Sequence, residues 1–221
     1  MTIRQSDADY ARSVLASEFS VSRETLAQLD LFVDLLLHWQ ARINLISPDT
    51  ISELWTRHVL DSAQIVAHLP KAEMICDLGS GAGFPGIVVS CLADRRFGTI
   101  LIEKSAKKSA FLREAIRLLD LNARVETSRI EECLPMLAGD VSVITARALA
   151  PLPELLALAE PAFIKGAEAV FHKGKTAHAE LTEARQSWMI DMRLEPSRSA
   201  DEGVLVCIKQ AKRYPVAGTV S

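Results

Sequence analysis

Two spacings of hydrophobic residues divide the chain into an N-terminal and a C-terminal part. Up to residue 70, apolar residues return every three or four positions, which is the period of one face of an amphipathic helix. Beyond residue 71, short apolar runs alternate with helical stretches, as in a parallel sheet covered by helices. The pattern therefore predicts an N-terminal helical cap over residues 1–70 and an α/β domain over residues 71–221.

In the N-terminal part, a first helix is predicted from Ser22, since several apolar residues share one helical face. They are Leu26, Leu29, Val33, Leu36, Leu37 and Ile43. Residues 47–50, Ser-Pro-Asp-Thr, then combine a helix stop with a new helix start. A second helix is predicted over residues 51–69, allowing for a break near His58, and Pro70 ends it.

In the C-terminal part, strands and helices are predicted to alternate. Buried strands are expected at residues 74–78, 99–103, 123–127, 141–145 and 168–172. Helices are expected at residues 85–93, 105–119, 129–134, 153–162 and 176–189. Two closing strands, near residues 191–195 and 203–208, have no helix between them, so they predict an antiparallel edge. The expected α/β fold is a mainly parallel seven-stranded sheet with helices on both faces.

Composition narrows the class of protein. The 221 residues are 49% hydrophobic and carry a net charge of −3, which predicts a soluble protein with a sizeable core. Residues 1–19 contain no apolar signal-peptide core, and no apolar run is long enough for a membrane span. The four cysteines form no Cys-x-x-Cys pair, so buried free thiols and a cytoplasmic location are expected. No metal is expected, and nothing in the sequence requires more than a monomer.

The sequence DLGSGAGFPG at residues 77–86 is the strongest candidate for a ligand-binding loop. Gly81, Gly83 and Gly86 satisfy the dinucleotide pattern G-x-G-x-x-G, directly after a predicted strand and before a predicted helix. Backbone N–H groups there face the carboxyl edge of the sheet, and glycines permit close approach of a ligand. Glu103 ends the next strand and suits a ribose diol. A nicotinamide dinucleotide and another nucleoside-type ligand are both compatible with these features.

Three features favour S-adenosylmethionine as the ligand. Asp77 lies two residues before Gly79, where an acid suits a cationic ligand and repels a pyrophosphate. The glycine run also starts earlier than a dinucleotide fold needs. Residues 127–131, after the third predicted strand, are placed to edge an adenine ring with a backbone N–H and a side-chain acceptor. The pattern resembles the methyl-donor loop of Rossmann-like methyltransferases.

Several short strings along the chain resemble one protein family. They are HWQARINL (residues 38–45), RHVLDS (57–62), DLGSGAGFPG (77–86), SRIEE (128–132), ARA (146–148) and FHKG (171–174). Together they resemble the RsmG (GidB) family of bacterial methyltransferases, which act on N7 of a guanine in the 16S ribosomal RNA of the small subunit. The resemblance runs from about Leu26 to the last strand, and the strings at residues 57–62 and 81–86 are specific for it.

The resemblance implies which residues contact S-adenosylmethionine. Gly79, Phe84, Ile130, Glu131 and Arg147 match the cofactor-contacting positions of the family. Phe84 replaces a leucine of some members, and some members carry aspartate in place of the predicted ribose-binding glutamate. With the loop residues, the predicted cofactor-binding set is Asp77, Gly79, Gly81, Gly83, Phe84, Glu103, Ile130, Glu131 and Arg147.

Methyl transfer to guanine N7 requires little acid–base machinery. N7 holds a lone pair in the ring plane and no proton, so no general base is needed. The sequence agrees, because it lacks Ser/His/Asp, HExxH and paired-carboxylate motifs. Catalysis then rests on alignment and desolvation. Arg147, at the end of the fourth predicted strand, is the predicted catalytic residue and would hold the methionine carboxylate or guanine O6. A surface salt bridge is the alternative.

An RNA substrate also needs positive charge near the site. The densest run of basic residues directly follows Glu103, although many runs of charged residues simply form the solvated face of a helix. The predicted RNA-contacting residues are Asn44, Arg57, His58, Lys104, Lys107, Lys108, Lys165 and Lys173. For His58 and Asp61, packing between helices of the cap is slightly favoured over lining of the RNA entrance.

Three other functions stay open on the sequence alone. A methyltransferase acting on a small metabolite would use the helical cap as a lid. A nicotinamide-dependent oxidoreductase would use the same glycine pattern, and a non-catalytic ribosome-assembly factor would retain the fold without methyl transfer. In the leading hypothesis, the expected partner is 16S ribosomal RNA or the small ribosomal subunit.

Overall fold

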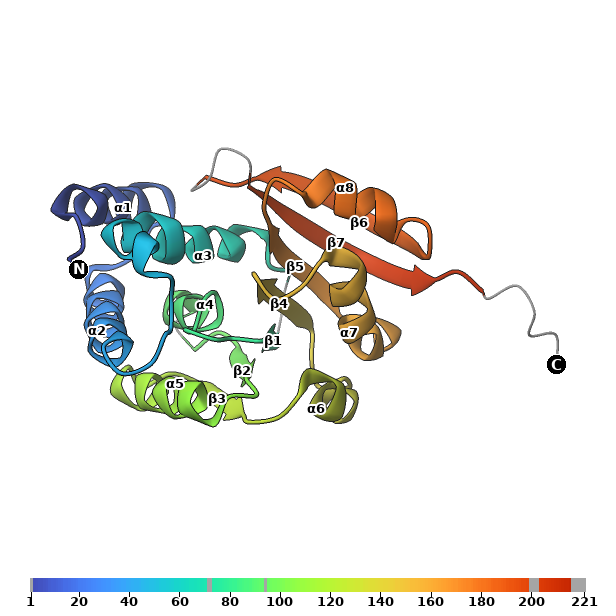
Figure 1. The fold of residues 1–221 in the computed structure, drawn as a ribbon, viewed down its shortest axis with the longest axis horizontal. Coiled ribbons are helices and arrows are strands. Elements are labelled where there is room, and N and C mark those ends of the chain that lie inside the picture. The colour runs from blue at the N-terminus through green and yellow to red at the C-terminus, as the bar shows by residue number, and fades with distance from the viewer. Residues whose placement is uncertain (1, 71–72, 94, 199–202, 216–221) are drawn as a thin grey trace.

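A central β-sheet organises the described part of the chain, which comprises residues 2–70, 73–93, 95–198 and 203–215 of the computed structural model. In this part the sheet has seven strands in the order β3-β2-β1-β4-β5-β7-β6 (Figure 1). The parallel strands are β1 (Met74–Leu78), β2 (Gly98–Ile102), β3 (Ala123–Glu126), β4 (Val143–Arg147) and β5 (Glu168–Lys173). The antiparallel edge consists of β6 (Trp188–Pro196) and β7 (Val204–Arg213). The predicted sheet is thereby confirmed.

Helices cover both faces of this sheet, which is why its central strands are almost continuously apolar. On one face, α4 (Gly86–Ala93) and α5 (Ala106–Leu118) pack together with the N-terminal helices. On the other face lie α6 (Ile130–Leu137), α7 (Leu152–Ile164) and α8 (Ala177–Ala184). No helix in the described ranges is both long and apolar enough to cross a membrane.

The N-terminal segment is regular in its first half and irregular in its second. Ser22 caps the second helix by accepting a hydrogen bond from Thr25 N–H at 3.1 Å. The elements are α1 (Gln5–Glu18), α2 (Arg23–Gln40), η1 (Pro48–Glu53), η2 (Trp55–Leu60), α3 (Asp61–Ala63) and η3 (Gln64–His68). The helix predicted over residues 51–69 is thus a series of short pieces, and the break near His58 falls inside the π-helical η2.

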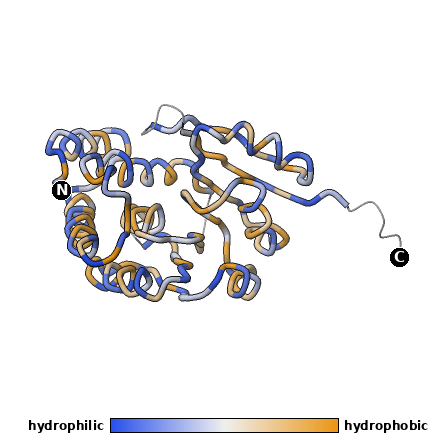
Figure 2. The backbone as a smooth tube through the Cα atoms, in the orientation of Figure 1, coloured by the Kyte–Doolittle hydropathy of each residue, from blue (hydrophilic) through white to orange (hydrophobic). Residues whose placement is uncertain are grey.

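The N-terminal helices share their core with the helices on one face of the sheet. Phe32 of α2 packs edge-on against Phe84 with ring centroids 5.4 Å apart, and its centroid lies 6.2 Å from that of Phe111 in α5. Figure 2 shows hydrophobic and hydrophilic residues alternating along these N-terminal helices, as this one-sided packing requires. The segment therefore packs directly on the α/β part, and a domain boundary at residue 70 stays a prediction.

Two local differences separate the expected elements from the observed ones. The helix predicted over residues 176–189 ends at Ala184, and Trp188 already begins β6. Trp188 is only 2% exposed and pairs with Arg213, so burial against the sheet overrides the helical spacing. The hydrophobic pattern also does not single out α1, because its buried face is built largely from small residues such as Ala8 and Ala11.

Candidate functional site

A cavity of about 380 Å³ opens at the carboxyl edge of the sheet, where the chain order reverses between β1 and β4. Ligands of open α/β sheets bind at such a switch point, because the loops on its two sides diverge. We call it the glycine-loop cavity. Its walls come from the segments after four neighbouring strands and include Gly79, Gly81, Glu103, Lys104, Lys108, Ser128, Arg129, Ile130, Glu131, Ala148, Leu149 and Glu154. Most of the predicted cofactor-binding residues therefore lie together.

The glycine loop depends on backbone conformations that other residues rarely adopt. Gly79 has φ +64°, and a Cβ there would lie 2.6 Å from Leu149 Cδ1, across the cavity wall. Gly83 has φ +85°, but its added Cβ would meet Ile87 and Phe32. Gly79 thus shapes the cavity, whereas Gly83 allows the loop to pack against the N-terminal helices. Gly83 is not part of the cavity wall.

Asp77 supports the loop from below and does not face the cavity. Its Oδ1 accepts a hydrogen bond from the Thr145 hydroxyl at 2.8 Å, and its Oδ2 accepts one from Gly86 N–H at 3.3 Å. Burial raises the pKa of Asp77 to about 6, although these hydrogen bonds act in the opposite direction. The expectation that this acid faces the ligand is corrected, since its carboxylate is buried between β1, β4 and α4.

Glu103 is the carboxylate that does border the cavity. It follows β2, where its Oε2 accepts from Gly81 N–H at 3.0 Å and its Oε1 accepts from Ser105 N–H at 2.7 Å. A carboxylate has further lone pairs on both oxygens, so this one can hold the loop and still accept hydrogen bonds from a sugar diol. The placement fits the role predicted for Glu103.

The opposite wall is formed where α6 begins. Ile130 is buried and apolar, whereas Glu131 is exposed in the first helical turn. A flat ring can rest on such an apolar side chain while backbone N–H groups at the helix start meet its edge. The structure therefore brings the predicted pair Ile130 and Glu131 to the same cavity as Gly79 and Glu103.

Phe84 lies outside that cavity wall, in the contact between the loop and the N-terminal helices. Its ring stacks on His58 with centroids 5.0 Å apart and packs edge-on against Phe32. The guanidinium carbon of Arg147 lies 5.3 Å from the same ring. The structure therefore packs Phe84 against Arg147 and His58 at the end of the glycine loop, and its contact with S-adenosylmethionine stays a prediction.

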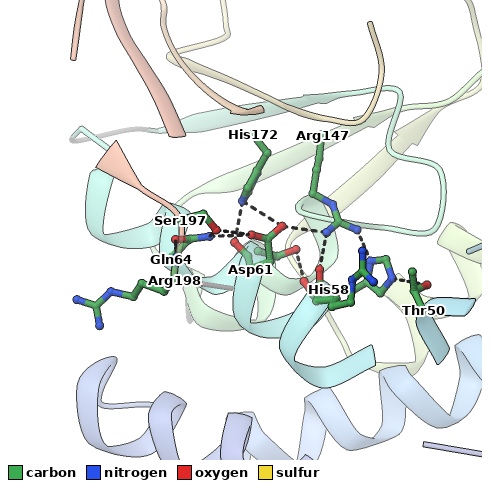
Figure 3. A network of polar contacts seen from close by, with 10 residues as sticks. Thr50, His58, Asp61, Gln64, Arg147, His172, Ser197 and Arg198 are labelled. Carbon is green, nitrogen blue, oxygen red and sulfur yellow. Dashed lines mark hydrogen bonds and ion pairs between the residues drawn. The ribbon is translucent and has the colours of Figure 1, made fainter. Parts of the chain in front are cut away.

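Arg147 turns from the end of β4 towards the N-terminal helices (Figure 3). Its Nη1 donates to the Asp61 carboxylate at 3.0 Å and to the Arg57 carbonyl oxygen at 2.9 Å, and its Nη2 contacts His58 Nδ1. The side chains of Arg147 and Asp61 are only 15% and 13% exposed. The alternative of a surface salt bridge therefore does not describe this ion pair, which joins the sheet to the N-terminal helices.

His58 is neutral in this arrangement. Burial and the neighbouring Arg147 lower the pKa of His58 to about 3. Its Nδ1 accepts from the arginine, so its Nε2 carries the proton and donates to the Thr50 hydroxyl at 2.9 Å. His58 thus has the packing role that the sequence slightly favoured, but it also borders a second cavity.

This second cavity, of about 410 Å³, lies beside the first on the same edge of the sheet. We call it the arginine cavity. It is lined by Thr50, Arg57, His58, Asp61, Arg147, Ala148, His172, Lys173, Gly174, Thr176, Glu180, Ser197, Gly203 and Val204. Ala148 borders both cavities. No motif marks Thr176 or Glu180, and His172 belongs to the string FHKG but was assigned no role of its own.

The predicted basic residues fall into three groups. Lys104 and Lys108 line the glycine-loop cavity, and Lys107 lies between them in the exposed first turn of α5. Lys173 is 9% exposed and is tied to Glu180 Oε2 at 2.6 Å and to the Ala150 carbonyl at 2.8 Å. Its expected RNA contact is therefore corrected, because the ammonium is already paired inside the protein.

Lys165 and Asn44 are not brought to either cavity. Lys165 follows α7 and lies in a groove with Ser142 and Glu168, at the amino ends of the strands. It is therefore on the edge of the sheet opposite the two cavities, which corrects the expectation that it extends the basic patch. Asn44 is exposed in the loop after α2 and lines neither cavity.

The remaining site expectations concern metals and thiols. Among the described residues there is no group of His, Cys, Asp and Glu side chains placed to hold a metal ion. All four cysteines, Cys76, Cys91, Cys133 and Cys207, are buried and free, as expected. Burial raises the pKa of the Cys91 thiol to about 12, so it is protonated and unreactive.

Known proteins resemble this chain along most of its length. A family model described as rRNA small subunit methyltransferase G, GidB, matches residues 25–201. A ribosomal RNA small subunit methyltransferase G from Bradyrhizobium sp. (strain BTAi1 / ATCC BAA-1182) is 44% identical over 96% of this chain and all of its own length. Another, from Rhodopseudomonas palustris (strain BisB18), is 48% identical over 84% of this chain and 80% of its own. The crystal structure of an O-methyltransferase from Bacillus cereus in complex with SAH shares the fold, with a TM-score of 0.58 at 13% identity over 91% of this chain and 97% of that one.

Proposed function

The chain belongs to the rRNA small subunit methyltransferase G (GidB) family, and on that premise we propose that it methylates N7 of a guanine in 16S ribosomal RNA with S-adenosylmethionine. The observation that carries the proposal is the glycine-loop cavity, in which Gly79, Glu103 and the start of α6 meet at the switch point of the sheet. These residue types suit a nucleoside with an attached amino-acid tail.

The residues of the cavity fit S-adenosylmethionine in three respects. Glu103 offers carboxylate lone pairs for the ribose hydroxyls, at the end of the strand next to the glycine loop. Ile130 offers an apolar contact for the adenine ring, beside the exposed Glu131. Gly79 leaves open the space that a Cβ would close against Leu149. When bound, S-adenosylmethionine supplies a methyl group on a positively charged sulfur.

The chemistry of N7 explains why the site needs no general base. The nitrogen lone pair forms the new bond, the base acquires a positive charge, and no proton is removed. His58 and His172, which line the arginine cavity, have lowered pKa values because they are buried, so both are neutral. The protein's part is to align the two reactants and to exclude water, for which the buried ends of β1 and β4 provide a rigid base.

Recognition of RNA is supported by the charge at the rim of the glycine-loop cavity. Lys104, Lys107 and Lys108 lie at the start of α5, on the same edge of the sheet as both cavities. The chain as a whole carries a net charge of −3, so this local patch favours a particular RNA surface over general binding to polyanions. A-form helices hide the major-groove edge that contains N7, so the target guanine must be unpaired or unstacked.

A transfer assay tests the proposal. Purified protein is incubated with tritiated S-adenosylmethionine and small ribosomal subunits, or their RNA, from cells that lack this enzyme. We expect label in the 16S RNA, recovered as N7-methylguanosine after digestion. Label found only in a small molecule would support the metabolite methyltransferase instead. A Glu103→Gln variant is the matched control for cofactor-dependent transfer, with Glu168→Gln on the opposite edge as the reference.

A further inference from the structure

The helical run from residue 48 to residue 68 changes its hydrogen-bond pattern along its length. It passes from the 3₁₀-helical η1 into the π-helical η2, then into α3 and back to the 3₁₀-helical η3. A 3₁₀-helix pairs residues three apart and a π-helix pairs residues five apart, so some N–H and C=O groups at the switch lack a helical partner. Buried backbone groups of this kind need partners from another segment of the chain.

The start of α1 provides partners at this switch. The backbone N–H of Arg4 donates to the Ser52 carbonyl oxygen at 3.0 Å. The carboxylate of Asp7, which is only 9% exposed, accepts from the N–H groups of Trp55 at 3.0 Å and Thr56 at 3.4 Å. Asp7 therefore caps the first turn of η2 from a distant segment, as an N-cap side chain does within its own helix.

Further contacts hold α1 against the same turn. Ala8 and Ala11 are buried in the core that also contains Trp55, and their small side chains let α1 lie close to η2. The guanidinium carbon of Arg12 lies 4.4 Å from the centroid of the Trp55 ring, at the start of η2. Figure 1 shows α1 alongside this helical run, which includes α3. Thus α1 braces η2 by hydrogen bonds to its backbone, by close packing and by a cation–π contact.

The turn that α1 braces is also the one that holds Arg147 (Figure 3). The Arg57 carbonyl oxygen and the Asp61 carboxylate accept from its Nη1 at 2.9 and 3.0 Å, and His58 Nδ1 contacts its Nη2. Arg57 and His58 belong to η2, and Asp61 follows it directly. The residue after Arg147, Ala148, borders both cavities. The geometry of η2 therefore fixes the end of β4 where the two cavities adjoin.

We propose that Asp7 is a positioning residue for methyl transfer, because it fixes η2 in the conformation that holds Arg147 beside the two cavities. The part of this inference that concerns catalysis rests on the proposed function. Group transfer needs the two reacting atoms about 3–3.5 Å apart, so a small displacement of the wall between two binding sites slows it. Asp7 lines neither cavity and acts through η2.

The pKa of His58 reports the state of η2 and requires no methyl transfer. Burial and the neighbouring Arg147 lower this pKa from 6.5 to about 3. In Asp7→Ala, two N–H groups lose their acceptor and η2 loosens, so we expect the exposed His58 to titrate above about pH 5. Asp7→Asn keeps a carbonyl oxygen as acceptor and should restore the wild-type behaviour. The imidazole ¹⁵N signals of His58 over a pH series measure the change.

Two further variants complete this measurement. Asp9→Ala is the matched control, because Asp9 is exposed on α1 and its contacts with Gln5 and Arg12 stay within that helix. It should leave the pKa of His58 as in the wild type. Arg12→Met removes the guanidinium from the Trp55 ring but leaves the backbone hydrogen bonds of Asp7 intact, so it should fold and raise the pKa of His58 by less than Asp7→Ala does. If neither Asp7→Ala nor Arg12→Met raises this pKa, α1 does not brace η2 and the proposal is wrong.

A double-mutant cycle tests whether the brace acts through Arg147. We expect Asp7→Ala to lower kcat/KM for small-subunit RNA about tenfold or more, and Asp7→Asn to recover most of the loss. In an Arg147→Lys background, Asp7→Ala should have little further effect, since the contacts that η2 makes with the guanidinium are already lost. An equal loss in both backgrounds would overturn the positioning role. Wild-type protein that transfers no methyl group to RNA would refute the proposed function, whereas the His58 signals would still test the brace.

Discussion

The carboxylate of Asp77 accepts a hydrogen bond from the hydroxyl of Thr145 across 2.8 Å, which ties β1 to β4 beneath the glycine loop. The two residues are also partners in the register of the parallel sheet. Asp77 simultaneously holds Gly86 N–H at the start of α4. One buried acid thus connects two strands and the first helix after the loop, so the shape of the cavity depends on a residue that does not line it.

This arrangement predicts a pH-dependent contribution of Asp77 to stability. Its pKa is raised from 3.8 to about 6 by burial, so the protonated acid favours the folded state. The contribution is fully present below about pH 4 and is lost as the pH rises through about 6. We expect the difference in unfolding free energy between the wild type and Asp77→Asn to change by on the order of 3 kcal/mol between pH 4 and pH 7. Urea unfolding across this range measures it, and parallel stability curves for the two proteins would contradict the buried-acid account.

Gly79→Ala should damage both the fold and ligand binding. The added methyl group lies 2.6 Å from Leu149 Cδ1 at φ +64°, a conformation that costs about 1–2 kcal/mol for a residue with a Cβ. We expect a lower Tm and at least tenfold weaker binding of S-adenosylhomocysteine by calorimetry. Gly139→Ala is the control, since a Cβ at Gly139 meets no atom within 4 Å. If both variants bind equally well, Gly79 does not shape the cavity.

Glu103→Gln should weaken cofactor binding more than it lowers the stability of the fold. The amide presents N–H donors towards Gly81 N–H or Ser105 N–H, where the carboxylate accepted from both. The proposed hydrogen bonds from the ribose hydroxyls would also lose their charged acceptor, and charged hydrogen bonds are worth about 1.5–3 kcal/mol, which corresponds to roughly 10–100-fold in Kd. Calorimetry with S-adenosylhomocysteine measures the change, with Glu168→Gln at the opposite edge as control. An unchanged Kd for Glu103→Gln would remove this residue from the cofactor site.

Lys107→Ala should weaken RNA binding without affecting the cofactor. Lys107 is exposed in the first turn of α5 and does not line the glycine-loop cavity. If it contacts a phosphate, the slope of log K against log salt becomes shallower by about 0.7–0.9. Filter binding of small-subunit RNA over a salt series provides the slopes. Lys165→Ala, on the opposite edge of the sheet, should leave the slope unchanged, and an equal effect of both variants would argue against this docking face.

The sheet could be predicted from the sequence because its strands are buried on both faces. The apolar runs around Cys76, Ile100 and Ile144 leave no helical alternative of useful length, and the observed register pairs these three residues. Trp188 shows the limit of such patterns. In the sequence, Trp188 continues the hydrophobic spacing of the preceding helix. In the structure it begins β6, because it pairs with Arg213 of the neighbouring strand.

The site was also predictable only where a residue's position depends on nearby sequence, and not where it depends on partners from distant segments. Glu103 was predictable because the end of a strand after a glycine loop fixes its position. Asp77 and Arg147 were placed correctly along the chain, but their partners, Thr145 and Asp61, come from distant segments that sequence spacing does not specify. The buried ion pair of Lys173 could not be predicted for the same reason, since its partner Glu180 lies on α8, a separate element.

Mapping of N7-methylguanosine in 16S ribosomal RNA tests the central claim most directly. RNA is compared from cells that contain this protein, from cells that lack it, and from the latter supplied with wild type or Glu103→Gln. The account predicts one N7-methylguanosine that disappears without the protein, returns with the wild type and returns only weakly with Glu103→Gln. An unchanged N7-methylguanosine content in cells without the protein would contradict it.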